Sequence, residues 1–518
     1  MMGLISALSG GGDYTLFYGF HDVNGKLSWR PDARNRWSVS FYQGDDYLNY
    51  RYRHSNGKDR EKARLSNVWG NWLLSTQWSR VHGSHLYSTQ NLSMVKYRLK
   101  NAQSYVRKDS KEEFKFDRDF RSAVSDISYK WDFKSELKRY WSLDFGVQSS
   151  YYRHQPNRFE ITNALVSYNE KPIHSLESVL YAENKVTIWN RLQLRMGARG
   201  VNYSTSDFST YRIEPRTAID LHFAKNHSFN LSYMVANQFS HLLFTQGEMM
   251  SNEVWVPASK TILPASSTQI SGGWNGSFKD DLYQVEIAAY HKELTDVATY
   301  KKGYSSLMGD LNWRNKVESG GSGEAYGIEF YLKKSKGLWN GFIGYSWSRA
   351  FRKFEHLNKG KSYVFEYDRP HNLSLNVNRK LSGKLTFSGS WTFQSGLPFT
   401  PVIGRQMIPA LIELEDEPYY YEAFIYGEKN SARMRYYHRL DLGLNYITKT
   451  KKGHKAQWTF AIYNAYNRKN PYSYMFTNEI TENNILTTDI FGGELDSFAL
   501  YQISYFPFIL TASYKVYF

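Results

Sequence analysis

The chain has 518 residues, of which 41% are hydrophobic and 17% aromatic, and its formal net charge is +16 at pH 7. It contains no cysteine, which excludes disulfides, thiolate nucleophiles and zinc–sulfur sites. Its mean hydropathy is −0.59. A large hydrophobic fraction together with a negative mean hydropathy suits a chain in which apolar residues alternate with polar ones. No run approaches the roughly 18 consecutive apolar residues of a membrane-spanning helix. Spanning strands remain possible, because their signal is weak in each segment.

The positive charge indicates anionic partners. Lysine and arginine are spread along the chain without a basic block, and no nucleic-acid recognition motif accompanies them. We therefore expect no nucleic-acid binding, and attraction to an anionic membrane surface or to anionic ligands instead.

The N-terminus, MMGLISALSGGGD, does not read as an export signal. It lacks a basic n-region, and its apolar core, Leu4–Leu8, is shorter than the roughly 7–15 residues that such a signal needs. We interpret residues 1–16 as a non-native-looking start or the remnant of an upstream strand or loop, and residues 17–518 as one architecture.

Alternation of apolar and polar residues, the mark of β-strands, runs through nearly the whole chain. The segment NLSLNVN (372–378) places three apolar side chains on one face and four polar ones on the other, and 384–394 and 439–445 repeat the pattern. A single strand of this kind fits a soluble antiparallel sheet equally well. The arrangement of the connections decides between a soluble sheet and membrane-spanning strands.

Short and long connections take turns along the chain. The short ones fall near 32–36, 81–85, 132–139, 189–191, 225–227, 279–282, 335–338, 381–384 and 448–454. The long ones fall near 53–63, 104–120, 157–175, 244–265, 302–324, 354–366, 403–433 and 472–496, and only 206–210 is short where a long one is due. Short turns at one rim and long loops at the other describe outer-membrane β-barrels. The segments between the turns number about 19, against the about 22 of transporters with a plugged barrel.

Aromatic residues near predicted strand ends fit the girdles of such a barrel. They are Trp29, Trp37, Trp69, Trp189, Trp339, Tyr446, Tyr514 and Tyr517. The sequence therefore predicts an all-β fold, a large antiparallel transmembrane β-barrel of about 19 strands with long extracellular loops.

Several segments resemble the TonB-dependent receptors, especially those of the Bacteroidetes. The C-terminal ISYFPFILTASYKVYF is similar to the last strand of that family, and WTFAIYNAYNRKNP (458–471) and MRYYHRLDLGLNY (434–446) resemble the strands before it. Three further segments also resemble sequences of this family: YDRPHNLSLNV (367–377), SGLPFT (395–400) and YRIEPR (211–216). The resemblance covers nearly all the chain.

The resemblance implies an outer-membrane receptor that actively imports a scarce solute: a siderophore, haem, cobalamin or a glycan. Implied partners are outer-membrane lipid and lipopolysaccharide, the TonB energy-coupling complex if a plug is present, and the barrel-assembly machinery, which would recognise Tyr514, Val516 and Phe518. Family members carry a signal peptide, a coupling box, a plug domain and early barrel strands before this region. None of these is recognisable here, so we expect a barrel fragment without its plug.

Catalytic chemistry has little support in the sequence. No G-x-S-x-G elbow and no H-E-x-x-H metal spacing occur, so we expect no enzymatic activity, cofactor or metal. His222 and His227 are interpreted as surface histidines. Glu286 and Asp441 are expected on lumen-facing positions, where they meet Arg or Lys across the lumen or contact the plug.

Ligand specificity is expected in the long external loops. In the loop 403–433, Glu415 and Asp416 are followed by Tyr419, Tyr420 and Tyr421, and a second loop carries Trp255. Tyrosines beside acids suit a sugar, a cationic group or a peptide, and Trp255 suits stacking. A packed cap over the barrel and a folded-back loop anchor are the alternatives.

Two other functions fit the same pattern. A barrel of this size without a plug would act as a passive outer-membrane pore, and the loops alone would serve a surface adhesion or interaction protein.

Overall fold

The computed structural model describes residues 14–56, 59–108, 113–162, 166–244, 253–302, 304, 313–409, 420–478, 498–504 and 506–517. The chain divides into two compact units. The first contains residues 1–219, 233–268 and 294–322, and the second contains residues 220–232, 269–293 and 323–518. No helix in the described part of the chain is long and apolar enough to cross a membrane.

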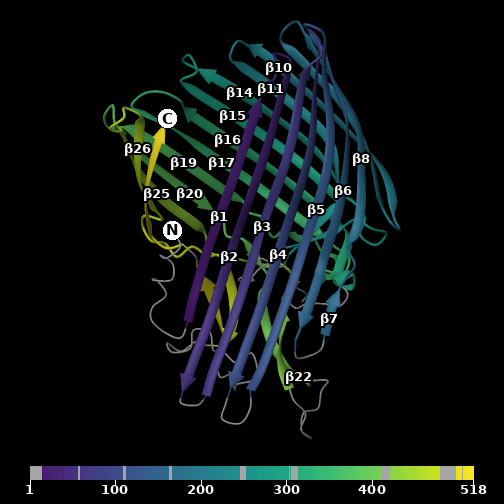
Figure 1. Ribbon diagram of the computed structural model, residues 1–518, viewed down its shortest axis with the longest axis vertical. Coiled ribbons are helices and arrows are strands. Elements are labelled where there is room, and N and C mark those ends of the chain that lie inside the picture. The colour runs from purple at the N-terminus through teal and green to yellow at the C-terminus, as the bar shows by residue number, and fades with distance from the viewer. Residues whose placement is uncertain are drawn as a thin grey trace. The chain divides into compact units, whose positions relative to one another are not determined.

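The first unit is built on a ladder of long antiparallel strands. They are β1 (Tyr14–Trp29), β2 (Asn35–Asn56), β3 (Asp59–Val81), β4 (Leu86–Lys108), β5 (Glu113–Lys138), β6 (Trp141–Ile161), β7 (Val166–Asn169), β8 (Ile173–Ile188) and β9 (Leu192–Thr205). Each strand from β1 to β6 pairs with the next, β7 and β8 both pair with β6, and β9 pairs with β8. Figure 1 shows β1 to β6 as neighbouring arrows. The unit also contains the hairpin β12 (Ser240–Leu243) and β13 (Val254–Pro257), and the 3-10 helix η2 (Trp313–Lys316).

Five strands cross the boundary between the two units, so each of them belongs partly to one unit and partly to the other. They are β10 (Ser209–Ala224), β11 (His227–Gln238), β14 (Ala265–Phe278), β15 (Tyr283–Tyr300) and β16 (Val317–Lys334).

The second unit has its own antiparallel ladder, in the order β17, β19, β20, β25, β26, β29. Its elements are β17 (Trp339–Lys353), η3 (Asn358–Gly360), β18 (Tyr363–Val364), β19 (His371–Lys380), β20 (Leu385–Gln394), β21 (Pro398–Phe399), β22 (Val402–Pro409), β23 (Tyr420–Tyr426), β24 (Ala432–Arg433), β25 (Tyr437–Lys449), β26 (Lys455–Tyr463), β27 (Ser473–Asn478), β28 (Phe498–Ile503) and β29 (Ile509–Tyr517). Short strands pair outside this ladder: β22 with β23, β27 with β28, and β21 with β24, which enclose β22 and β23 in the sequence.

Nineteen of the described strands have nine or more residues, enough to cross a bilayer, which takes roughly 9–11. This number agrees with the predicted count of about 19. The predicted long loops 53–63 and 104–120 are wrong in part, because β2 and β3 extend to residues 56 and 59 and β4 and β5 to residues 108 and 113.

The two faces of the first ladder differ in the way that a membrane requires. Residues directly opposite in antiparallel strands share a face, so the paired Phe41, Leu74, Met94 and Ile127 form one row across β2 to β5. All four are 36–48% exposed. Exposed apolar side chains in such rows are suited to lipid. We call this the apolar face and the opposite one the polar face.

The second ladder alternates in the same way. On β17, Ile343, Tyr345 and Trp347 are exposed. On the polar face of this ladder, the side-chain amide of Asn378 in β19 donates to Oδ1 of Asn376, at 3.0 Å, and to Oδ1 of Asn340 in β17, at 3.3 Å. Such side-chain hydrogen bonds hold polar groups on a face turned away from lipid.

Seven of the eight aromatic residues predicted for girdles are exposed, but two of the predictions are wrong. Tyr517 lies three residues from Tyr514 and therefore on the polar face. Trp29, Trp37, Trp189 and Trp339 are exposed near strand ends, as are Tyr446, Tyr514 and Tyr517. Trp69 instead lies on the polar face of β3 and packs against a buried apolar cluster. Alternation places Trp69 on the opposite face from Leu74, and the sequence gave no sign that part of the polar face is covered.

Leu92→Arg tests the assignment of the faces. Leu92 is 40% exposed in a row with Thr76 and Tyr129 on the apolar face. A charge at the centre of the lipid band lowers the free energy of unfolding by about 2–4 kcal/mol. Urea titration of protein refolded into phospholipid vesicles measures this loss. Ser93→Arg, one residue on and on the polar face, is the control, and an equal loss in both variants would contradict the assignment.

Candidate ligand-binding site

The hairpin β12–β13 packs onto the polar face of the first unit. Val254 and Val256 of β13 are 3% and 0% exposed. They belong to one apolar cluster with Leu99 of β4, Phe120 of β5 and Phe159 of β6. These three strand residues lie on the face opposite the exposed row. The hairpin therefore covers the side of the strand ladder, here called the wall, that is turned away from lipid. Burial of their apolar surface holds it there.

A second cluster anchors the end of the hairpin. Phe239 stacks on Tyr203 of β9 with ring centroids 4.8 Å apart. The Tyr203 hydroxyl donates to the Ala258 carbonyl at 3.3 Å, and the Ala258 amide donates to the Phe239 carbonyl at 2.8 Å. Both ends of the segment are therefore fixed by side-chain and backbone contacts.

Three further contacts tie η2 and the start of β16 to other parts of the same unit. The Trp313 indole donates to Glu170 Oε2 at 2.5 Å, and the Arg314 guanidinium pairs with the other oxygen of that carboxylate. Ser319 Oγ donates to the Thr261 carbonyl at 2.7 Å. The covering elements thus hold one another as well as the wall.

Trp255 lies between the two buried valines and pairs with Leu242 across the hairpin. Because successive side chains on a strand point to opposite faces, Trp255 lies on the side of β13 away from the wall, where it is half-buried. An indole on an anchored hairpin is a suitable stacking surface for a planar group. The ligand-binding role of Trp255 remains a prediction.

The other predicted ligand residues belong to the loop 403–433. Glu415, Asp416 and Tyr419 lie outside the described residues. Tyr420 and Tyr421 begin β23, where they pair with Pro409 and Ile408 of β22. Part of this predicted loop is therefore a β-hairpin, and the ligand-binding role of these five residues stays a prediction.

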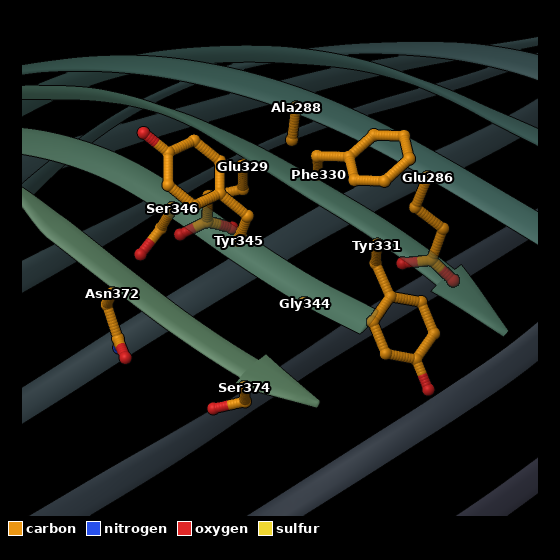
Figure 2. Close-up of a pocket in the computed structure, with 10 residues that line it drawn as sticks. All are labelled: Glu286, Ala288, Glu329, Phe330, Tyr331, Gly344, Tyr345, Ser346, Asn372 and Ser374. Atoms are coloured by element: carbon orange, nitrogen blue, oxygen red, sulfur yellow. The ribbon is translucent and has the colours of Figure 1, made fainter. Parts of the chain in front are cut away.

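A groove of about 290 Å³ in the second unit contains two carboxylates (Figure 2). Glu286 of β15 and Glu329 of β16 line it together with Tyr331, Asn372 and Ser374. In Figure 2 the side chains of Glu286, Tyr331 and Asn372 point to the same side of the strands. Among the described residues neither carboxylate has an ion-pair partner, so the groove is acidic and suits a hydroxyl or cationic group.

For Asp441 and Glu286 the sequence predicts either a basic partner or contact with a plug. Asp441 has a basic partner, with Arg439 Nε 2.9 Å from its Oδ2, whereas Glu286 has no such partner in the described part of the chain. His227 stacks on Trp274 at 5.8 Å. No cluster of three or more potential metal ligands occurs among the described residues.

A buried carboxylate organises the loops of the second unit. The side chain of Asp368 is 0% exposed, pairs with Arg433 and accepts a hydrogen bond from the Ala350 amide at 2.7 Å. Arg433 also donates to the carbonyls of Asp368, at 2.8 Å, and Gly396, at 3.1 Å. A Cβ at Gly396 would lie 1.8 Å from the Met434 carbonyl oxygen, so only glycine permits this approach. The motif YDRPHN (367–372) thus has a structural role that its sequence did not reveal.

The asparagine-rich end of β26 also has a structural role. Asn464 adopts a positive φ of 53°, and its amide donates to Asp441 Oδ1 at 2.9 Å. Asn470 exchanges hydrogen bonds of 3.0 Å with the backbone of His438. These contacts close the ends of β25 and β26.

The last strand is β29. Tyr514 pairs with Trp458 of β26, the two rings 4.6 Å apart, and both are exposed. Val516 lies two residues on and therefore on the same apolar face, whereas Phe518 lies outside the described residues. Recognition of these residues by the barrel-assembly machinery stays a prediction.

Residues 5–468 match the family described as TonB dependent receptor-like, beta-barrel. The chain belongs to this family. Members of this TonB-dependent receptor family are outer-membrane receptors and transporters, not enzymes. The predicted β-barrel class, outer-membrane location and lack of enzymatic activity are thereby confirmed, while the Bacteroidetes likeness stays a prediction.

Solved structures share the fold at low identity. The ferric-catecholate import receptor Fiu from E. coli K12 is 9% identical, with a TM-score of 0.55 over 97% of this chain and 80% of that one. BauA, the ferric preacinetobactin receptor from Acinetobacter baumannii, is 11% identical, with a TM-score of 0.53 over 96% and 78%. FpvA from Pseudomonas aeruginosa PAO1, bound to pyoverdine, is 12% identical, with a TM-score of 0.53 over 96% and 76%. No curated protein matches the sequence.

Acid is expected to loosen the hairpin through His241. His241 belongs to β12, which is not one of the long strands of the ladder. Burial lowers the pKa of its imidazole. The hydrogen bond with the Leu263 carbonyl, at 3.0 Å, and the charge of Asp296 raise the pKa but do not cancel this effect. A depressed pKa means that stability is complete above the unfolded value of about 6.5 and is lost as pH falls below it. The hydrogen-exchange protection factors of residues 254–263, measured relative to the intrinsic exchange rate at each pH, should fall between pH 7.5 and 5.

His241→Gln is the matched variant for this prediction. Glutamine keeps a hydrogen-bond donor but does not titrate, so the fall in protection factors should disappear. An unchanged pH dependence in His241→Gln would show that another group is responsible.

Asp368→Ala should release the loops of the second unit. Removing one partner of a buried ion pair leaves Arg433 uncompensated and costs about 3–5 kcal/mol. Limited proteolysis within residues 354–370 and 427–436 measures the release. Glu160→Gln is the control, because its half-exposed pair with Arg158 contributes only about 0–1 kcal/mol. Equal proteolysis in the two variants would refute the organising role of Asp368.

Proposed function

We propose that this receptor binds a ferric siderophore and takes part in its TonB-dependent uptake across the outer membrane. Family membership supports the transport class. The observation that carries the binding site is the hairpin β12–β13, fixed to the polar face by Val254 and Val256, with Trp255 on its other side. Fiu is named as a ferric-catecholate import receptor, BauA as the ferric preacinetobactin receptor and FpvA as a pyoverdine receptor, which favours this substrate class over haem, cobalamin and glycans.

The chemistry of the site agrees with this substrate class. Indole rings stack on planar groups and gain about 0.5–1.5 kcal/mol beyond the burial of apolar area. The net charge of +16 attracts anionic chelates and raises their rate of encounter. An anchored hairpin also binds with less loss of conformational entropy than a mobile loop.

Energy coupling calls for a plug domain and the TonB complex. We propose that a plug acts together with this barrel, on the same polypeptide or on a separate one. In that arrangement the barrel supplies the wall and the external binding surface, and the plug supplies the part that TonB pulls.

Uptake of radioactive iron tests the proposal. A deletion strain should lose uptake of at least one chelate from a panel of ferric catecholates and hydroxamates, and the wild-type gene should restore it. Trp255→Ala should weaken chelate binding about tenfold, equivalent to about 1.4 kcal/mol of stacking, and Trp255→Phe should bind nearly as the wild type.

The two parts of the proposal fail separately. Unchanged uptake of every chelate in the deletion strain would refute the function. Normal binding by Trp255→Ala, with uptake intact, would refute only the site.

A further inference from the structure

The apolar face of β4 to β6 changes character within one row. Met94, Ile127 and Tyr151 form an exposed apolar row across the three strands. The next positions on the same face, away from the short connections, include Lys96 and Arg153. One row is two residues, or roughly 7 Å along the strand. Cations therefore begin at the depth where acyl chains give way to headgroups.

Small residues separate these cations. Lys96 pairs with Ser125, which pairs with Arg153, and one row further on Arg98 pairs with Ala123. Neighbouring strands lie about 4.8 Å apart, so the backbones of Lys96 and Arg153 are about 10 Å apart. Lysine and arginine side chains are long enough for both to reach one anion placed over Ser125.

The first two cations are also the ones without internal neutralisation. Arg98 reaches across Gly70 of β3, and its Nη2 lies 2.6 Å from Asp45 Oδ2. A Cβ at Gly70 would lie 2.1 Å from Asp45 Oδ1, so glycine makes this contact possible. Among the described residues, Lys96 and Arg153 have no carboxylate partner.

Further from the lipid the same face is hollowed and carries acidic as well as basic side chains. Lys100 lies 3.2 Å from Asp119 and lines a groove of about 340 Å³ with Arg64, Ser66 and Ala102. A groove with small side chains in its floor, hydroxyl groups and charged edges suits a carbohydrate.

We propose that Lys96, Arg98 and Arg153 bind the phosphate groups of a phosphorylated glycolipid in the outer leaflet. Its acyl chains would lie against Met94 and Ile127, its phosphates would accept charge-assisted hydrogen bonds from the three cations, and its sugars would extend toward the groove. Arginine and lysine are the side chains suited to phosphate. The proposal rests on the location in the outer membrane and not on the transported solute.

Binding of purified glycolipids in detergent tests this site. The probes are bisphosphorylated lipid A, the same lipid without phosphates, and phosphatidylglycerol, measured by native mass spectrometry. The triple variant Lys96→Gln, Arg98→Gln and Arg153→Gln should bind bisphosphorylated lipid A at least tenfold more weakly than the wild type. The wild type should bind the phosphate-free lipid as weakly as the triple variant binds lipid A.

A matched control removes three charges elsewhere on the same face. Arg51→Gln, Arg53→Gln and Lys62→Gln lie on β2 and β3 further from the apolar rows, and this variant should bind lipid A within about twofold of the wild type. An equal loss in the control would mean diffuse attraction and overturn the site. Equally tight binding of phosphatidylglycerol would overturn the preference for a glycolipid.

Folding is verified by the shift in gel mobility on heating. If the triple variant does not fold, Arg153→Gln alone is measured, with an expected loss of threefold or more. A loss below twofold in this single variant would overturn the proposal.

Discussion

Inside a bilayer no water is available to the peptide groups, so each backbone N–H and C=O must find its partner in a neighbouring strand. The ladders of both units follow from this requirement, as do the strand lengths. The same requirement fixes the alternation of side chains, because a strand in such a ladder shows one face to lipid and the other away from it. The face turned to lipid carries the exposed row that contains Met94 and Ile127. The face turned away from lipid carries the hydrogen-bonded asparagines of β17 and β19.

The covered patch on the polar face is a departure from this simple division. Leu99, Phe120 and Phe159 occupy positions that alternation assigns to the polar side, yet they are almost fully buried. They are stable there because Val254 and Val256 cover them. The polar face is therefore part solvent-lined wall and part support for an inward-folded hairpin, and the candidate ligand site depends on that support.

The sequence predicted the strands well, since alternation and turn residues are local signals. It placed Tyr514 and Trp339 correctly for the same reason. It failed for Trp69, because alternation says which face a residue occupies but not what covers that face. The strand extensions at 53–63 and 104–120 were also missed, since polar hairpins outside lipid have the composition of loops. The roles of Asp368 and Arg433 depend on residues 65 positions apart, a pairing that one sequence does not reveal.

The length of β5 has a consequence for how the receptor meets its surroundings. Its 26 residues span roughly 85 Å when extended, while a strand needs only about 9–11 residues to cross the bilayer. More than half of β5 therefore lies beyond the hydrocarbon, and its partner β4, of 23 residues, extends with it. Such a hairpin extends well beyond the lipid headgroups, so an antibody, phage or toxin can contact paired β-structure there instead of an irregular loop.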